Sequence, residues 1–130
     1  MIQQQTVINV SDNSGVKKVM CIKVIGAFKK RYANIGDFTV VSVKALKDKI
    51  QNKFKVAKGD VMLAVIVKTK KKYKRRDGLV FFMNRNSAVL IQKQGLPIAT
   101  RIFGSLPRYF KKKKIARIIS LNTVFFLSHG

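Results

Sequence analysis

Residues 64–90, AVIVKTKKKYKRRDGLVFFMNRNSAVL, contain an apolar run, a cationic segment, an Asp-Gly pair and a second apolar run. Residues 61–67 are all aliphatic or Met, a pattern typical of a strand buried on both faces. The Asp77-Gly78 pair is a turn signal, and residues 79–83 resume with strand formers. The stretch therefore predicts a β-hairpin with a basic tip, and we expect the rest of the fold to be organised around it.

The basic tip predicts a polyanionic partner. Every residue from 68 to 76 is cationic except Thr69 and Tyr73. So many like charges repel one another, and they are best accommodated beside a polyanion with regularly spaced charges. The alternative interpretation is a solvated loop that only aids solubility. The whole chain argues against it, because 28 Lys and Arg against 5 acidic residues give a net charge of +23, more than solubility requires. We therefore expect nucleic acid as the partner.

Composition also limits the possible chemistry. A chain of 130 residues fits one domain with a real core, and 47% hydrophobic residues exclude a wholly disordered chain. With one Cys, one His and no Glu, neither a zinc ligand set nor a catalytic triad can be assembled. We expect no cofactor, no metal and no enzymatic activity. Cys21 lies in an apolar run, so we expect a buried, unreactive thiol.

The acidic residues are all Asp, and each lies beside a turn signal or a Lys, which predicts turn and capping roles. They are Asp12, Asp37, Asp48, Asp60 and Asp77. Residues 1–16 carry no Lys or Arg, and no apolar run reaches the ~18 residues of a membrane span. We expect neither a targeting segment nor membrane insertion.

Short strands separated by turn signals predict a small closed or partly open β-barrel. Residues 6–10 alternate, residues 16–25 are mainly apolar, and residues 87–92 add a further strand. Gly36-Asp37 and Gly59-Asp60 each precede an apolar run, as expected of a turn whose Gly is left-handed. Residues 44–58 are Lys-rich and predict a long loop or a short irregular helix.

The C-terminal part has a different pattern. Ser105 can cap a helix, Pro107 suits its first position, and apolar residues recur at near-helical spacing up to residue 119. We divide the chain into a barrel domain (1–104), a short helical part (105–122) and an apolar extension (123–130). Four consecutive apolar residues in the extension predict that it is buried, docked on a neighbouring protein or in a crevice of the nucleic acid. Folding back onto the barrel and a disordered tail are the alternatives.

Several motifs occur in an order that is specific as a set. They are MIQ at the start, DNSG followed by KKVMCIKV, KRYANIGD, KGDV, AVIVKTKK leading to RRDG, and TRIFG. On these residues the chain resembles the universal large-subunit ribosomal protein numbered fourteen, from residue 1 to about residue 121. The resemblance implies a five-stranded β-barrel with a small helical C-terminal part, bound to large-subunit rRNA at the interface with the small subunit.

The resemblance also implies a docking face for small-subunit rRNA and for neighbouring large-subunit proteins. Carried over to this sequence, the face comprises Thr100, Arg101, Phe103, Arg117 and Ser120. The family usually has Lys at the position of Arg117, so the charge is kept.

This sequence departs from the family pattern at three places. Met83 replaces a usual aromatic residue, although Phe81 and Phe82 are adjacent and able to repack. Residues 111–114 are all Lys where the family usually carries Glu, and residues 124–130 replace a shorter ending with Pro and Glu. The excess of Lys, Ile, Phe and Asn resembles coding in an AT-rich genome. It favours a mitochondrial, organelle-encoded member over a plastid or bacterial cytoplasmic one.

We therefore predict a structural rRNA-binding protein whose cations contact phosphates. The first choices are Lys68, Lys70, Lys71, Lys72, Lys74, Arg75 and Arg76, followed by Lys29, Lys30, Arg31 and Arg85. Tyr32 and Tyr73 either stack on bases or pack over a neighbouring Lys stem. The main alternative function is a free-standing barrel that binds single-stranded nucleic acid. A cationic membrane-active protein and an enzyme are further alternatives, which the sequence disfavours.

Overall fold

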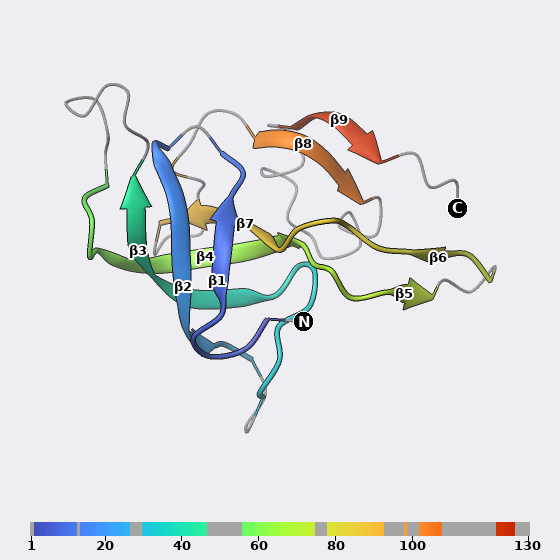
Figure 1. Ribbon diagram of the computed structural model, residues 1–130, viewed down its shortest axis with the longest axis horizontal. Coiled ribbons are helices and arrows are strands. Elements are labelled where there is room, and N and C mark those ends of the chain that lie inside the picture. The colour runs from blue at the N-terminus through green and yellow to red at the C-terminus, as the bar shows by residue number, and fades with distance from the viewer. Residues whose placement is uncertain are drawn as a thin grey trace.

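A computed structural model describes residues 2–12, 14–26, 30–46, 56–74, 78–92, 98, 102–107 and 122–126. Five of its strands form a closed barrel in the order β1-β2-β3-β4-β7 (Figure 1). They are β1 (Val7–Val10), β2 (Val16–Val24), β3 (Phe38–Leu46), β4 (Val61–Lys68) and β7 (Ser87–Ile91). Neighbouring strands are antiparallel except β1 and β7, which pair in parallel and close the barrel. The predicted mainly-β fold with a five-stranded barrel is confirmed.

The barrel interior is filled by aliphatic side chains that alternate along the strands. Ile8 and Val10 are 0% and 9% exposed, whereas Val7, the first residue of β1, is 54% exposed. Ile66 and Leu90, from the two strands that flank the basic segment, belong to the same core cluster. Alternation in residues 6–10 therefore predicted the buried side of β1 correctly.

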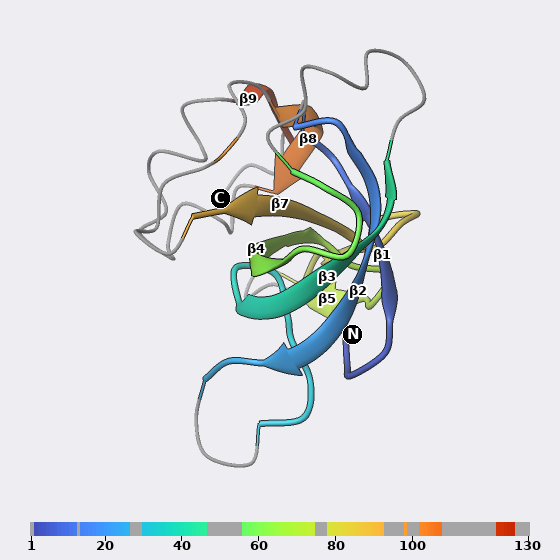
Figure 2. The ribbon, with the colours of Figure 1, turned by 90° about the vertical axis from the view of Figure 1, so that its left-hand side faces the viewer.

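The second half of β4 is buried on both faces, as its unbroken apolar sequence predicted. Ala64 and Ile66 pack in the barrel core, and the intervening Val65 and Val67 are also 0% exposed. In Figures 1 and 2 the C-terminal strands β8 (Ile102–Pro107) and β9 (Asn122–Phe126) lie beside the barrel close to β7. Only the start of β4 departs from the expectation, because Val61 is 63% exposed.

The two Gly-Asp turns have the predicted left-handed glycine. Gly36 has φ 88° and Gly59 has φ 91°. In both turns the Asp carboxylate accepts a hydrogen bond from the amide three residues earlier, at 2.7 and 2.9 Å. The amides of Asp37 and Asp60 in turn donate to the carbonyl oxygens of those same residues, at 3.0 and 3.2 Å. The predicted turn roles of Asp37 and Asp60 are confirmed, while Asp48 and Asp77 lie outside the described residues.

The expected helix start in the C-terminal part is wrong. Ser105 and Pro107 belong to β8, where they pair in parallel with Val124 and Phe126 of β9. A partner strand almost twenty positions away supplies hydrogen bonds that local capping signals do not reveal, and the described residues contain no helix. The remainder of the expected helical part, 108–121, lies outside the described residues.

The described part of the apolar extension folds back on the chain itself. Residues 123–126 lie in β9 and pair with β8, in a two-stranded sheet separate from the five barrel strands. Docking on a neighbouring protein or in an rRNA crevice stays a prediction, with its two alternatives. Residues 127–130 lie outside the described part. The expected loop or irregular helix at 44–58 is also partly replaced, since residues 44–46 extend β3 and residues 58–59 form a turn. Residues 47–55 are not described.

Candidate nucleic-acid interface

The basic segment forms an arm that continues β4 and β7 beyond the barrel. Its strands, β5 (Tyr73–Lys74) and β6 (Val80–Phe81), pair antiparallel, and Gly78 has φ 89° near the turn. Figure 1 shows the arm projecting from one side of the barrel. We call residues 68–86 the basic arm; residues 75–77 within it are not described. The predicted hairpin is present as β5 and β6, although β4 itself pairs with β7 rather than with residues 79–83.

The root of the basic arm is fixed by backbone and side-chain hydrogen bonds. The Lys70 amide donates to Asn86 Oδ1 at 2.9 Å, and the Met83 amide donates to the Thr69 carbonyl at 3.3 Å. The Asn9 amide of β1 donates to the Asn86 carbonyl at 3.1 Å. The β4–β7 register shifts between Ile66 and Lys68, and such an irregularity bends a strand. The arm is therefore anchored to the barrel at the point where it departs from it.

Two cations, Lys68 and Arg85, influence each other electrostatically at this root. Lys68 is partly buried, and its pKa is lowered, first by burial and second by the positive charge of Arg85. Both causes disfavour a charged ammonium there. The positive charges of Lys68 and Arg85 therefore repel each other at the root of the arm. An anion placed between the two side chains would relieve the repulsion.

The predicted phosphate contacts are only partly brought together. Lys70, Lys71, Lys72 and Lys74 are exposed on the basic arm, and Arg85 is exposed near its root. Lys29, Arg75 and Arg76 lie outside the described residues.

The second basic segment, which precedes β3, is arranged differently. Lys30 Nζ forms an ion pair with Asp37 at 3.0 Å, so its charge is partly neutralised within the chain. Arg31 is exposed, and Tyr32 is 46% exposed. Tyr73 lies in β5, but its side chain is not described. Of the two tyrosines predicted to stack or to pack over a Lys stem, Tyr32 therefore has part of its ring open to a partner.

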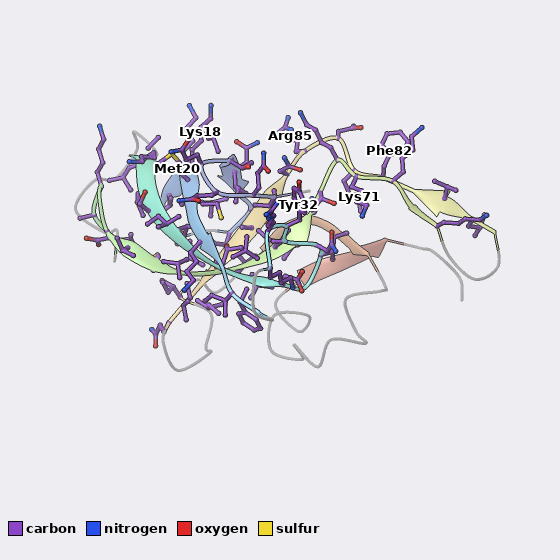
Figure 3. The ribbon with its side chains drawn as sticks, turned by 90° about the horizontal axis from the view of Figure 1, so that it is seen from below. Lys18, Met20, Tyr32, Lys71, Phe82 and Arg85 are labelled. Carbon is purple, nitrogen blue, oxygen red and sulfur yellow. The ribbon has the colours of Figure 1, made fainter. Side chains whose placement is uncertain are left out.

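Two exposed groups were not predicted from the sequence. Phe82 is 55% exposed, whereas residues 79–83 had been predicted as a strand continuing the apolar pattern. It does not repack in place of the partly buried Met83. Lys18 is exposed on β2, opposite Asn9 of β1. Its charge within the mainly apolar residues 16–25 was the signal for it. Figure 3 shows Lys18, Arg85 and Phe82 along the same side of the molecule, with Phe82 farther out along the arm.

The predicted docking face for the small subunit cannot be assembled from the described residues. Phe103 lies in β8, but its side chain is not described. The other four members, Thr100, Arg101, Arg117 and Ser120, lie outside the described part of the chain. This face stays a prediction.

The thiol of Cys21 lies inside the protein rather than at a reactive surface site. Cys21 is a free, fully buried thiol, and burial raises its pKa. Within the described ranges, no group of His, Cys, Asp or Glu is arranged to hold a metal ion. Those ranges also contain no helix long and apolar enough to cross a membrane.

A closed barrel of short strands with an anchored, projecting cationic arm defines a small, strongly basic β-barrel protein. Residues 1–126 match the family described as Ribosomal protein L14p/L23e, and the chain belongs to this family. It is therefore a structural protein of the large ribosomal subunit rather than a catalyst, and it is located on the ribosome. The resemblance drawn from the sequence motifs is confirmed.

Proposed function

We propose that the chain binds large-subunit rRNA through the basic arm, at the interface with the small subunit. The observation that carries the proposal is an arm whose root is hydrogen-bonded to the barrel while Lys70, Lys71, Lys72 and Lys74 remain exposed. The proposed phosphate contacts are Lys68, Lys70, Lys71, Lys72, Lys74, Arg75, Arg76 and Arg85, with Lys29, Lys30 and Arg31 in a second group.

The mechanism is electrostatic and geometric. Cations that neutralise phosphates release condensed counterions, which supplies affinity that does not depend on sequence. Phosphate contacts fix the orientation of the protein, and the shape of the folded rRNA decides where they form. Because the barrel holds the arm in one direction, this sequence-independent attraction fixes the protein in a defined position on the rRNA. No covalent bond is made or broken in this role.

The same proposal includes the subunit interface and the compartment. Thr100, Arg101, Phe103, Arg117 and Ser120 would contribute to bridges with small-subunit rRNA and contacts with neighbouring large-subunit proteins. The Lys- and Ile-rich composition supports a mitochondrial ribosome. Sedimentation of the native protein tests the assignment, because a ribosomal protein migrates with large-subunit particles. The alternative, a free-standing barrel for single-stranded nucleic acid, would remain at the top of the gradient.

Salt-dependent binding tests the role of the basic arm. The double variant Lys71→Ser with Lys74→Ser should flatten the slope of log affinity against log salt by about 0.7 to 0.9 for each phosphate that is no longer neutralised. The matched control is Lys44→Ser with Lys58→Ser, which removes two exposed lysines, one near the end of β3 and one in the turn before β4. Figure 1 shows the end of β3 and the start of β4 on the side of the barrel away from the arm. The control should leave the slope nearly unchanged. Equal slopes for both variants would show that the arm is only a solvated hairpin.

A further inference from the structure

Phe82 lies on a face of the basic arm that combines apolar and cationic side chains. Its ring is 55% exposed, and Lys72 Nζ stands 5.9 Å from the ring centroid. Lys74 pairs with Val80 across β5 and β6, and Val80 is 54% exposed. Because alternate residues of a strand point to the same side, Val80 and Phe82 share one face of the arm, with two lysines opposite them.

The position of this ring is not explained by packing within the protein. The barrel core is completed by aliphatic residues such as Ile66 and Leu90, and Phe82 takes no part in that cluster. An aromatic side chain beside cations is the arrangement by which proteins bind single-stranded nucleic acid, since the ring stacks on a base while the cations follow the backbone. Neighbouring strands lie about 4.8 Å apart. The lysine row and the apolar row therefore run side by side, as phosphates and bases do along one strand of RNA.

We propose that this face of the basic arm binds an unpaired nucleotide of large-subunit rRNA. The base stacks on Phe82, and the adjoining phosphates are held by Lys72 and Lys74. The inference rests on the proposed function and adds a base contact to it, because the cations alone would bind the phosphates of any RNA. A duplex hides the faces of its bases in the helical stack, so the site selects a loop, a bulge or a strand end.

The surrounding charges favour RNA over a lipid surface. Among the described side chains, Phe82 and Val80 form the apolar row of this face, and each has a lysine opposite it. Arg85 and Lys18 lie on the same side of the molecule as Phe82 (Figure 3), so the cationic path continues from the arm toward β1 and β2. A narrow apolar strip with cations along its length fits one nucleotide strand better than a membrane.

A fluorescence experiment tests the stacking directly. The chain has no Trp, so Phe82→Trp introduces one indole that keeps the ability to stack. Its emission is followed while the 130-residue chain is titrated with an rRNA fragment containing unpaired nucleotides. The same fragment annealed to its complement, inorganic polyphosphate and anionic vesicles are titrated in parallel. The matched control is Leu79→Trp. Leu79 is also 54% exposed, but it precedes β6 whereas Phe82 follows it, and the ring under Lys72 is that of Phe82.

We expect the unpaired fragment to quench the Trp at position 82 and to affect the Trp at position 79 much less. Polyphosphate, the annealed duplex and vesicles should leave both emissions nearly unchanged. Phe82→Ala should weaken binding of the unpaired fragment by about 5- to 150-fold, and Phe82→Trp should bind as the unsubstituted chain does. Since the ring is largely exposed, none of these changes disturbs the core.

The outcomes separate this inference from the proposed function. If the unsubstituted chain binds none of the rRNA fragments, the proposed function itself fails. If it binds the unpaired fragment but Phe82→Ala binds equally well, stacking is refuted while the phosphate contacts stand. Quenching by polyphosphate or duplex, equal quenching at position 79, or quenching by vesicles alone would likewise overturn the stacked base.

Discussion

Replacing Asp12 by Ala should weaken the seam of the barrel, the parallel pairing of β1 with β7 that closes it. Asp12 is fully buried, and one of its carboxylate oxygens accepts hydrogen bonds from the amide and the hydroxyl of Ser14, at 3.1 and 2.5 Å. The other oxygen accepts the amide of Leu90 in β7 at 3.1 Å. The carboxylate therefore joins the turn after β1 directly to the strand that β1 must meet.

The position of Asp12 in the seam shows why its loss is costly. The amides of Asn9 and Ser11 donate to carbonyl oxygens of residues 86 and 88, both at 3.1 Å. The bond from Leu90 to Asp12 follows next along the strand, so a side-chain oxygen replaces a backbone acceptor. Asp12→Ala leaves two buried amides without this acceptor, and each such loss costs about 1 to 3 kcal/mol. Removing the buried carboxylate also removes its desolvation cost, which offsets part of the loss. The net decrease in the free energy of unfolding is then about 3 kcal/mol.

Chemical and thermal unfolding measure this loss. At the usual unfolding entropy per residue, about 3 kcal/mol lowers the Tm of a chain of this size by about 11 °C. Ser14→Ala is the matched control, because it removes only the hydroxyl bond and should cost about 1 kcal/mol. Hydrogen exchange at the Leu90 amide should accelerate in Asp12→Ala more than in Ser14→Ala. A loss below about 1 kcal/mol with unchanged exchange at Leu90 would refute the role of Asp12 in closure.

Three further predictions concern single positions. Gly59→Ala should cost about 1 to 2 kcal/mol in chemical unfolding, because φ is 91° although the new Cβ meets no atom within 4 Å; Lys58→Ala is its control, and equal effects would contradict the strain argument. Cys21 should react with a thiol reagent only as fast as the barrel opens, since the thiol is buried and its pKa raised; rapid labelling of the native chain would exclude this. Lys68→Met should raise stability at neutral pH, because the lowered pKa of Lys68 means that its charge is unfavourable in the folded state. The gain should shrink as pH rises through that lowered pKa toward 10.5, where Lys68 is neutral in both states; a gain that is constant between about pH 7 and pH 10 would contradict it.

Local signals predicted the barrel because each was tied to a backbone requirement. Gly36 and Gly59 occupy left-handed positions that most residues avoid, so Gly followed by Asp marked both turns. A third turn of the same form, at residues 3–6, was not predicted from the sequence. The amides of Gln3 and Thr6 bond to the Thr6 hydroxyl and the Gln3 carbonyl, at 3.2 and 3.1 Å. Its left-handed residue is Gln5, with φ 70°, and no glycine signalled it.

The features that the sequence did not reveal depend on distant partners or on exposure. β8 exists as a strand because β9 pairs with it, and nothing in the local sequence of residues 102–107 specifies that partner. The ion pair of Lys30 with Asp37 depends on how the chain returns before β3. Phe82 lies in an apolar run, yet its ring is exposed because the whole run, residues 79–83, lies in the arm and outside the barrel. Hydrophobic pattern predicts which residues can be buried, whereas topology decides which of them are.

The division between barrel and arm accounts for a chain that is both strongly cationic and ordered. Residues 64–67 and 88–91 are fully buried or nearly so, and they form the two strands from which the arm extends. The burial of these residues stabilises the fold, whereas the repulsion among the cations of the basic arm destabilises it. Because this repulsion is concentrated outside the barrel core, it destabilises the arm more than the barrel. A polyanion that binds the arm relieves the repulsion. An arm anchored in this way keeps one direction while its charges remain unneutralised, which is the condition for phosphate contacts to position a protein on folded RNA.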